Sequence, residues 1–186
     1  MSTRGLIGIR VDGERKYSYN HSDSYPSWLG KQTAREFEQL LHEHGIEELR
    51  KKARFMKPVN ASIPPDIATR EFFAEFEDPQ VGGDSTEEDW YRLFRKAQGI
   101  WRPFLMYGIY DGVVVSGNDE APDMDAEYIY EWDLDNTRFI AKAVYGEEYA
   151  YDVAPFDWHC SSWDESKHTA SRFVASSKML DEIGDM

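Results

Sequence analysis

Five consecutive polar residues, 20–24, hold the acid, base and hydroxyl side chains that nucleophilic or general acid–base catalysis uses. Successive side chains of a strand point to opposite faces of a sheet, so His21 and Asp23 can share a face on which Ser22 does not lie. Asn, Ser and Asp also bond to nearby backbone groups, so the same run can instead fix the loop that follows. The sequence leaves two interpretations open, a structural loop or a binding site made of Asn20, His21, Asp23 and Tyr25.

Ser2 is the basis of a second chemical hypothesis. If Met1 is removed, the Ser2 hydroxyl is a nucleophile and its free α-amine a base, as in N-terminal-nucleophile hydrolases. With Met1 in place Ser2 has no free amine. A small hydrolase that uses Ser2, or His21 and Asp23 beside Asn20, is therefore the alternative to the leading interpretation given below.

Metal and phosphate motifs are incomplete in this sequence. Asp133 and Asp135 match the start of a calcium-binding loop, but Arg138 stands where that loop requires glycine. The single cysteine, Cys160, lacks the placed partner ligands of a zinc site. We expect no metal and no cofactor.

The polar run ends the second strand of a predicted β-hairpin. Alternating apolar residues flank Asp12-Gly13, and an Asp-Gly pair between such runs is a strong hairpin signal. A second Asp-Gly pair, Asp111-Gly112, predicts another hairpin from strands 104–110 and 113–115. Further strands are predicted at 127–133, 138–145 and 149–153, with a tight turn between the first two.

Helical spacing fills the middle of the chain, residues 27–99. It predicts one helix over 32–44 that Gly45 ends, and another over 46–56 with basic residues on its exposed face. A third helix runs through 67–76 with Pro65 at its first position. The sequence Ser85-Thr86-Glu87-Glu88 is a capping box that opens a fourth helix.

This order of elements predicts one α+β domain over 1–186. An antiparallel sheet is built from the N-terminal hairpin and the C-terminal strands, and the central run of helices packs on it. Residues 100–165 form an acidic, aromatic β region, and residues 166–186 form a tail helix.

Charge is distributed unevenly along the chain. The 186 residues carry a formal net charge of −14, and residues 111–165 hold 15 acidic side chains against 2 basic ones. Such a field repels nucleic acid and favours a partner with a basic surface. One cysteine excludes an intrachain disulfide, and no apolar run approaches the ~20 residues of a membrane span. We therefore expect a cytoplasmic protein that binds neither nucleic acid nor membrane; its oligomeric state is left open.

Two blocks of the sequence carry a family resemblance. Thr3-Arg4-Gly5-Leu6-Ile7-Gly8 with the block from Tyr19 to Gly30, and later Glu127-Tyr128-Ile129-Tyr130, resemble an uncharacterised family of small actinobacterial and actinophage proteins. That family has no established activity. The resemblance implies a phage or mobile-element setting and assigns no catalytic residue.

The leading functional interpretation is a phage-type accessory protein that binds and modulates a host protein. Aromatic anchors inside a charged rim are typical of binding surfaces, and the region 111–165 combines both. The predicted binding residues are Tyr128, Tyr130 and Trp132 with the acidic Asp123, Asp125 and Glu127. The competing interpretation is that these aromatic residues belong to the core.

Overall fold

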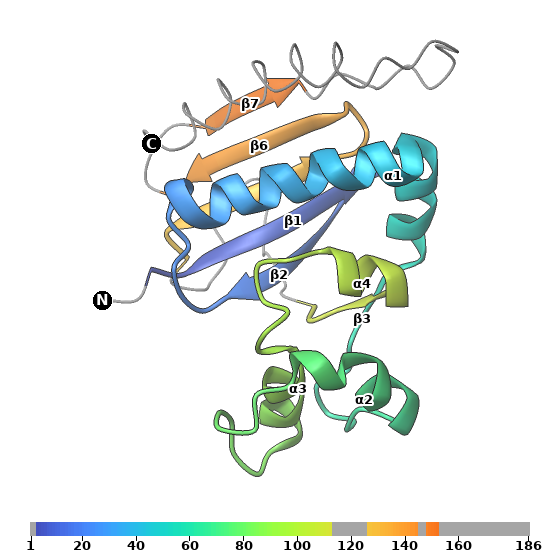
Figure 1. The fold of residues 1–186 in the computed structure, drawn as a ribbon, viewed down its shortest axis with the longest axis vertical. Helices are drawn as coiled ribbons and strands as arrows, with labels where there is room; N and C mark the ends of the chain where they lie inside the picture. The colour runs from blue at the N-terminus through green and yellow to red at the C-terminus, as the bar shows by residue number, and fades with distance from the viewer. Residues whose placement is uncertain (1–2, 113–125, 145–147, 153–186) are drawn as a thin grey trace.

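The computed structural model describes residues 3–112, 126–144 and 148–152 of the chain. A five-stranded sheet in the order β2-β1-β5-β6-β7 carries helices on one face, so the predicted α+β class is confirmed (Figure 1). The strands of this sheet are β1 (Gly5–Val11), β2 (Glu14–Asn20), β5 (Tyr128–Asp133), β6 (Arg138–Ala143) and β7 (Glu148–Asp152). The remaining elements are η1 (Pro26–Gly30), α1 (Lys31–Phe55), β3 (Lys57–Pro58), α2 (Ile67–Phe73), η2 (Ala74–Phe76), α3 (Thr86–Phe94), α4 (Arg102–Tyr107) and β4 (Ile109–Tyr110).

The β1–β2 hairpin forms as predicted. Asp12 and Gly13 both have positive φ, 53° and 77°, which is the backbone conformation of a two-residue type I′ turn. The Asp135 carboxylate in the β5–β6 turn accepts hydrogen bonds from the backbone N–H groups of Asp12 and Gly13, at 2.7 and 2.8 Å. The two turns are thereby joined at one end of the sheet.

One strand pair differs from the predicted antiparallel sheet, because β1 and β5 are parallel. Parallel neighbours need a long crossover connection, and the helical middle of the chain supplies it. The other pairs of this sheet, β1–β2, β5–β6 and β6–β7, are antiparallel.

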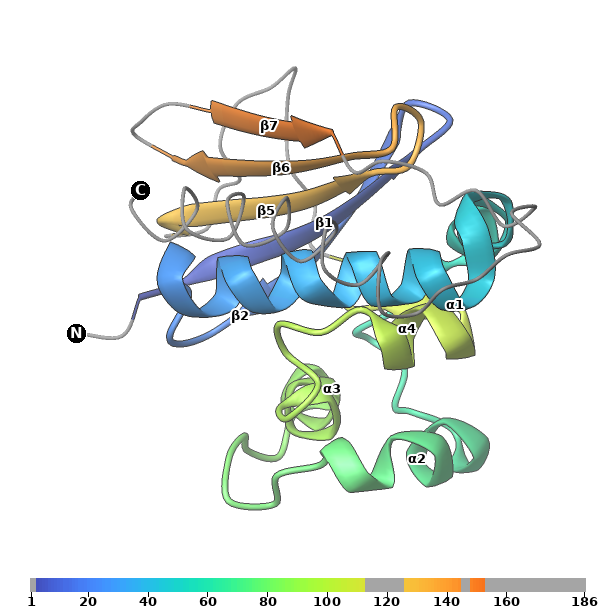
Figure 2. The same cartoon turned by 45° about the horizontal axis from the view of Figure 1, so that its top comes forward.

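Helix α1 crosses one face of the sheet and is bent at Gly45 (Figure 2). Gly45 has φ 73° and ψ 162°, a conformation essentially restricted to glycine, so the two predicted helices exist as two segments around this residue. The second segment is tied to the turns at the end of the sheet. Arg54 binds the Asp12 carboxylate through two nitrogens, and Arg50 donates to the Leu134 and Asp135 carbonyls.

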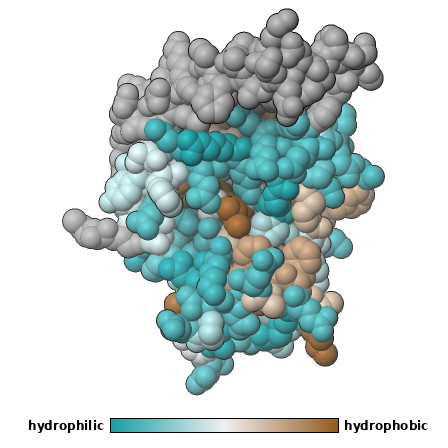
Figure 3. All heavy atoms as spheres, in the orientation of Figure 1, coloured by the Kyte–Doolittle hydropathy of each residue, from teal (hydrophilic) through white to brown (hydrophobic). Residues whose placement is uncertain are grey.

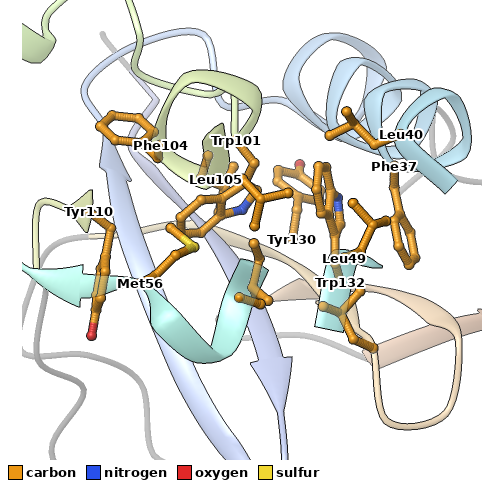
Figure 4. Packing of buried hydrophobic residues seen from close by; sticks show 14 of the residues in the cluster. Phe37, Leu40, Leu49, Met56, Trp101, Phe104, Leu105, Tyr110, Tyr130 and Trp132 are labelled. Carbon is orange, nitrogen blue, oxygen red and sulfur yellow. The ribbon is translucent and has the colours of Figure 1, made fainter. Parts of the chain in front are cut away.

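The core lies between α1 and the sheet and is rich in aromatic rings (Figure 4). The Trp132 ring stacks on Phe37 with centroids 4.9 Å apart, and its Nε1–H donates to the Thr33 carbonyl at 3.1 Å. A buried indole is stable only with a partner for its N–H, and α1 provides that partner.

Below this layer α2, η2 and α3 form a small helical lobe around Phe73 (Figure 2). The predicted capping box at Ser85 and Glu88 is present. The predicted start of the next helix is wrong by two residues. The first helical residue is Ile67 rather than Pro65, because the Asp66 side chain accepts the Thr69 N–H at 2.7 Å and makes Asp66 the N-cap.

The predicted strand over 104–110 is wrong for most of its length, since residues 102–107 form α4. Pro103 suits the first turn of a helix, and Gly108 ends it with φ 89°. Only Ile109 and Tyr110 are extended; they pair with β3 rather than with a following strand. Gly112 does have positive φ, 75°, but residues 113–115 and the tail helix over 166–186 lie outside the described residues.

Candidate binding groove

An open groove runs between the first part of α1, the lobe and α4, with a volume of about 780 Å³. We call it the α1–α4 groove. It is lined by Ser27, Trp28, Lys31, Gln32, Arg35, Glu36, Gln39, Phe72, Glu75, Phe76, Ile100, Arg102, Pro103 and Met106. In Figure 3 brown and tan side chains gather in the middle of this face, between the helices that Figure 1 labels α1 and α2.

Two aromatic side chains of the groove are exposed to water. Trp28 is 66% exposed and Phe72 is 41% exposed, although both are large enough to stabilise a core if they were buried. Phe76, Ile100 and Met106 lie partly buried beside them in the groove wall. Exposed apolar side chains gathered in one concave place are typical of a binding surface rather than of ordinary solvent-facing structure.

The local backbone explains why Trp28 faces outward. Pro26 begins the short helix η1, and Leu29 is buried at 2% exposure, so Leu29 anchors this turn to the core. The Trp28 N–H donates to the Tyr25 carbonyl at 3.0 Å, which closes the turn. Adjacent residues of a helix point in different directions, so burial of Leu29 leaves Trp28 on the open side.

Glu36 lies in the groove wall and holds the start of α4. Its carboxylate accepts the backbone N–H groups of Trp101 and Arg102, at 2.9 and 2.8 Å. Burial raises the pKa of Glu36 to about 7, and the two backbone hydrogen bonds and Arg102 oppose this rise only in part. The groove therefore contains a carboxyl group that gains or loses its proton near neutral pH.

Lys31 and Arg35 are the cations on the α1 side of the groove. Within the part of the chain that the structure describes, neither forms an ion pair or a side-chain hydrogen bond. Arg102, across the groove, is different: two of its nitrogens bind the Glu43 carboxylate at 2.7 and 3.0 Å. The groove thus joins an apolar surface to two positive charges that are available to a ligand.

The polar run predicted from the sequence lies at another place and braces the loop after β2. Asn20 is buried, and its Nδ2 donates to the Ser24 hydroxyl at 2.7 Å and to the Ser22 carbonyl. The Ser24 carbonyl accepts the Tyr130 hydroxyl at 2.9 Å, and the Ser24 N–H donates to the Thr3 carbonyl. These bonds satisfy buried polar groups inside the loop, which is the structural interpretation of the run.

His21, Asp23 and Tyr25 are more accessible than Asn20. The His21 N–H donates to Gln98, and burial together with Arg95 and Arg4 lowers the pKa of its imidazole. Asp23 is exposed and has φ 56°, and Tyr25 is 45% exposed. Neither Asp23 nor Tyr25 lines the α1–α4 groove.

Two of the predicted aromatic anchors are core residues. Tyr130 and Trp132 are fully buried because alternate side chains of β5 face the helices, so their prediction as surface anchors is wrong. Tyr128 is partly buried, and Glu127 is exposed. Asp123, Asp125 and Ser2 lie outside the described residues, so their predicted roles stay predictions.

The other face of the sheet holds a polar cluster that the sequence did not indicate. Tyr17, Gly8 and Glu131 are neighbours across β2, β1 and β5, and the Tyr17 hydroxyl donates to Glu131 at 2.7 Å. A side chain on Gly8 would meet the Tyr17 ring at 2.5 Å, so glycine lets Tyr17 lie across β1. Arg15 also contacts Glu131 at 3.1 Å, and burial raises the pKa of Glu131.

Sequence patterns alone gave no reason to single out Trp28, Phe72 or Glu36. The sequence places Phe72 only within the helix predicted over 67–76, and it places Trp28 outside every predicted helix and strand. Their shared location depends on how the lobe folds back beside α1, which is a long-range feature.

Comparison with known protein families, with curated proteins and with solved structures finds no match for this chain. No helix of the described residues has the length and apolar character needed to cross a bilayer. Within the same residues no group of three or more His, Cys, Asp or Glu side chains is placed to bind a metal ion.

Proposed function

We propose that this protein acts by binding, and that its α1–α4 groove receives the apolar face of an α-helix from a partner protein. The observation that carries the proposal is the exposure of Trp28 and Phe72 on the same groove. Aromatic side chains of this kind are the residues on which binding energy concentrates in protein interfaces.

The shape of the groove favours a helical segment as its occupant. Its lining residues on the α1 side extend from Ser27 to Gln39, which is about 18 Å or just over three helical turns at 1.5 Å per residue. An amphipathic helix places apolar side chains every three or four residues along such a length, and helix-in-groove recognition uses these anchors. The rim cations Lys31 and Arg35 add charge complementarity to a segment that is not basic.

A small molecule fits the observations less well. Trp28 is two-thirds exposed, so a compact ligand in the groove would leave much of this ring in water, whereas small-molecule sites bury most of their ligand. A partner helix covers both Trp28 and the wall opposite to it.

Parts of the sequence interpretation remain separate predictions. A phage setting, a host protein as the partner, and recognition of a basic surface through residues 111–165 are not needed for the groove proposal. The catalytic alternative at Ser2, or at His21 and Asp23, is also independent of it.

The proposal is tested with a fluorescently labelled amphipathic peptide of three to four helical turns, with leucines on one face and neutral polar residues elsewhere. Binding is measured by fluorescence anisotropy for the wild-type chain and for Trp28→Ala and Phe72→Ala. We expect each substitution to weaken binding at least about tenfold, because exposed aromatic anchors typically contribute more than 1.4 kcal/mol.

Phe55→Ala is the matched control. Phe55 is an aromatic residue of α1 that is 70% exposed, more than either Trp28 or Phe72, but it does not line the groove. Its substitution should leave peptide binding unchanged. Equal weakening by all three substitutions, or no binding to the wild-type chain, would contradict the proposal.

A further inference from the structure

The charged residues on the rim of the α1–α4 groove indicate the charge of its partner, which the apolar walls do not. Lys31 and Arg35 are four residues apart on α1, so they lie on one face of the helix, about one turn from each other. Trp28 precedes Lys31 by three residues, and all three side chains line the groove. The α1 wall therefore holds an aromatic anchor and two positive charges, beside the Glu36 carboxyl that accepts the N–H groups at the start of α4.

Lys31 and Arg35 differ from the basic side chains of the second half of α1 in having no carboxylate partner among the described residues. Farther along α1, Arg50, Lys51, Lys52 and Arg54 each contact a carboxylate of Glu47, Glu48 or Asp12. For Lys31 and Arg35 no such partner is found among residues 3–112, 126–144 and 148–152. Two neighbouring positive charges without partners repel each other, and a ligand with negative charges relieves that repulsion.

The wall across from α1 holds a carboxylate in addition to Arg102, whose charge is paired with Glu43. Glu75 in η2 is exposed and lines the groove across from α1. A partner helix with acidic side chains on both flanks would meet this carboxylate unfavourably. An acidic flank on the α1 side only avoids the repulsion, so the charges also select the orientation of the helix.

We propose that the partner helix carries acidic residues three or four positions apart along one flank of its apolar face, and that these residues pair with Lys31 and Arg35. This inference rests on the proposed function, since it specifies the partner of the same groove. The occupant is thus an acidic amphipathic segment, even though the chain as a whole is acidic.

A charge-swap experiment tests the inference. Three peptides share one leucine face and differ only at two flank positions four residues apart, which are Glu, Gln or Lys. Their dissociation constants are measured by anisotropy at low salt for the wild-type chain and for a Lys31→Glu/Arg35→Glu variant. Both substitutions are at groove-lining positions near the start of α1, where acidic residues suit the helix dipole.

We expect the wild-type chain to bind the Glu peptide about tenfold more tightly than the Lys peptide, with the Gln peptide between them. The double variant should reverse this order. If its circular dichroism shows loss of fold, Arg35→Glu alone should still reduce the preference for the Glu peptide.

The outcomes separate the two proposals. Equal binding of all three peptides to the wild-type chain, with no change in the charge-reversed variant, overturns the acidic-partner inference but leaves groove binding intact. A preference of the wild-type chain for the Lys peptide also overturns it. If none of the peptides binds, the proposed function itself fails, and this inference fails with it.

Discussion

At the scale of single residues, the groove contains one group whose charge changes near neutral pH. The Glu36 carboxylate accepts two backbone N–H groups from the start of α4, but burial raises its pKa to about 7. Two hydrogen bonds to the charged form do not offset the loss of hydration on burial. The folded chain therefore binds this proton more tightly than the unfolded chain does.

This difference predicts how stability depends on pH. A carboxyl whose pKa is higher in the folded state stabilises the fold at low pH, and this contribution is lost as pH rises from about 4.5 to about 7. The free energy of unfolding should therefore fall over that range relative to Glu36→Gln, by about 3 kcal/mol at 1.36 kcal/mol per pKa unit. Urea unfolding of both proteins between pH 4.5 and 8 measures the difference.

Glu75→Gln is the control for this prediction, because it removes an exposed carboxyl from the same groove. Its unfolding free energy should follow the wild-type curve. Parallel curves for the wild type and Glu36→Gln across the range would show that Glu36 does not titrate there.

At the scale of elements, the sequence predicts local structure well and long-range structure poorly. The Asp12-Gly13 hairpin, the break at Gly45 and the Ser85 capping box are encoded by a few adjacent residues, and all three are confirmed. The strand predicted at 104–110 failed because its apolar residues suit a strand or a short buried helix equally well. Pro103 lies in the first turn of α4 and Gly108 is its C-cap. These two residues were the signals that favoured a helix over a strand.

The candidate site was less predictable than the fold. The residue types around Asn20 allowed a binding site to be predicted there, yet Asn20 is buried and bonds within its own loop. Tyr130 and Trp132 were predicted both as possible anchors and as possible core, and only the pairing of β5 with β1 decides for the core. Trp28 and Phe72 are 44 residues apart, so nothing local in the sequence shows that they share a groove.

The bend of α1 gives a prediction with a definite sign. Gly45 has φ 73° and ψ 162°, where any side chain is strained, so Gly45→Ala should destabilise the fold by about 1 to 3 kcal/mol. In an uninterrupted helix the same substitution would instead stabilise it by up to about 1 kcal/mol. Thermal or urea unfolding distinguishes the two cases, with the exposed Lys51→Ala as a control expected to change stability by less than about 0.5 kcal/mol.

At the scale of the whole molecule, the cations on the α1 rim of the groove have the opposite sign to the net charge of the chain. The net charge is −14, and residues 111–165 contribute most of the excess. Lys31 and Arg35 form a small positive area on this acidic protein. The chain thus has two separate electrostatic features, a long-range negative field and a short-range positive rim, and they act on a partner in different ways.

The two electrostatic features differ in range, and salt therefore affects association and dissociation differently. An acidic peptide approaching the groove meets the field of the whole chain first, so its association rate should rise as salt increases from about 0.01 to 0.15 M and the Debye length falls from about 30 to 8 Å. Its dissociation rate should rise as well, because salt also weakens the contacts with Lys31 and Arg35. A basic partner that binds residues 111–165 would show the reverse for association, a rate that falls with salt.

Stopped-flow measurements with the Glu peptide decide between these cases, and the Gln peptide serves as a control whose association rate should hardly change. Neutralising Asp123, Asp125 and Glu127 together should speed association of the Glu peptide at low salt and slow that of a basic partner. An association rate for the Glu peptide that falls with salt, and is unaffected by the triple substitution, would show that the rim rather than the net charge governs the approach to the groove.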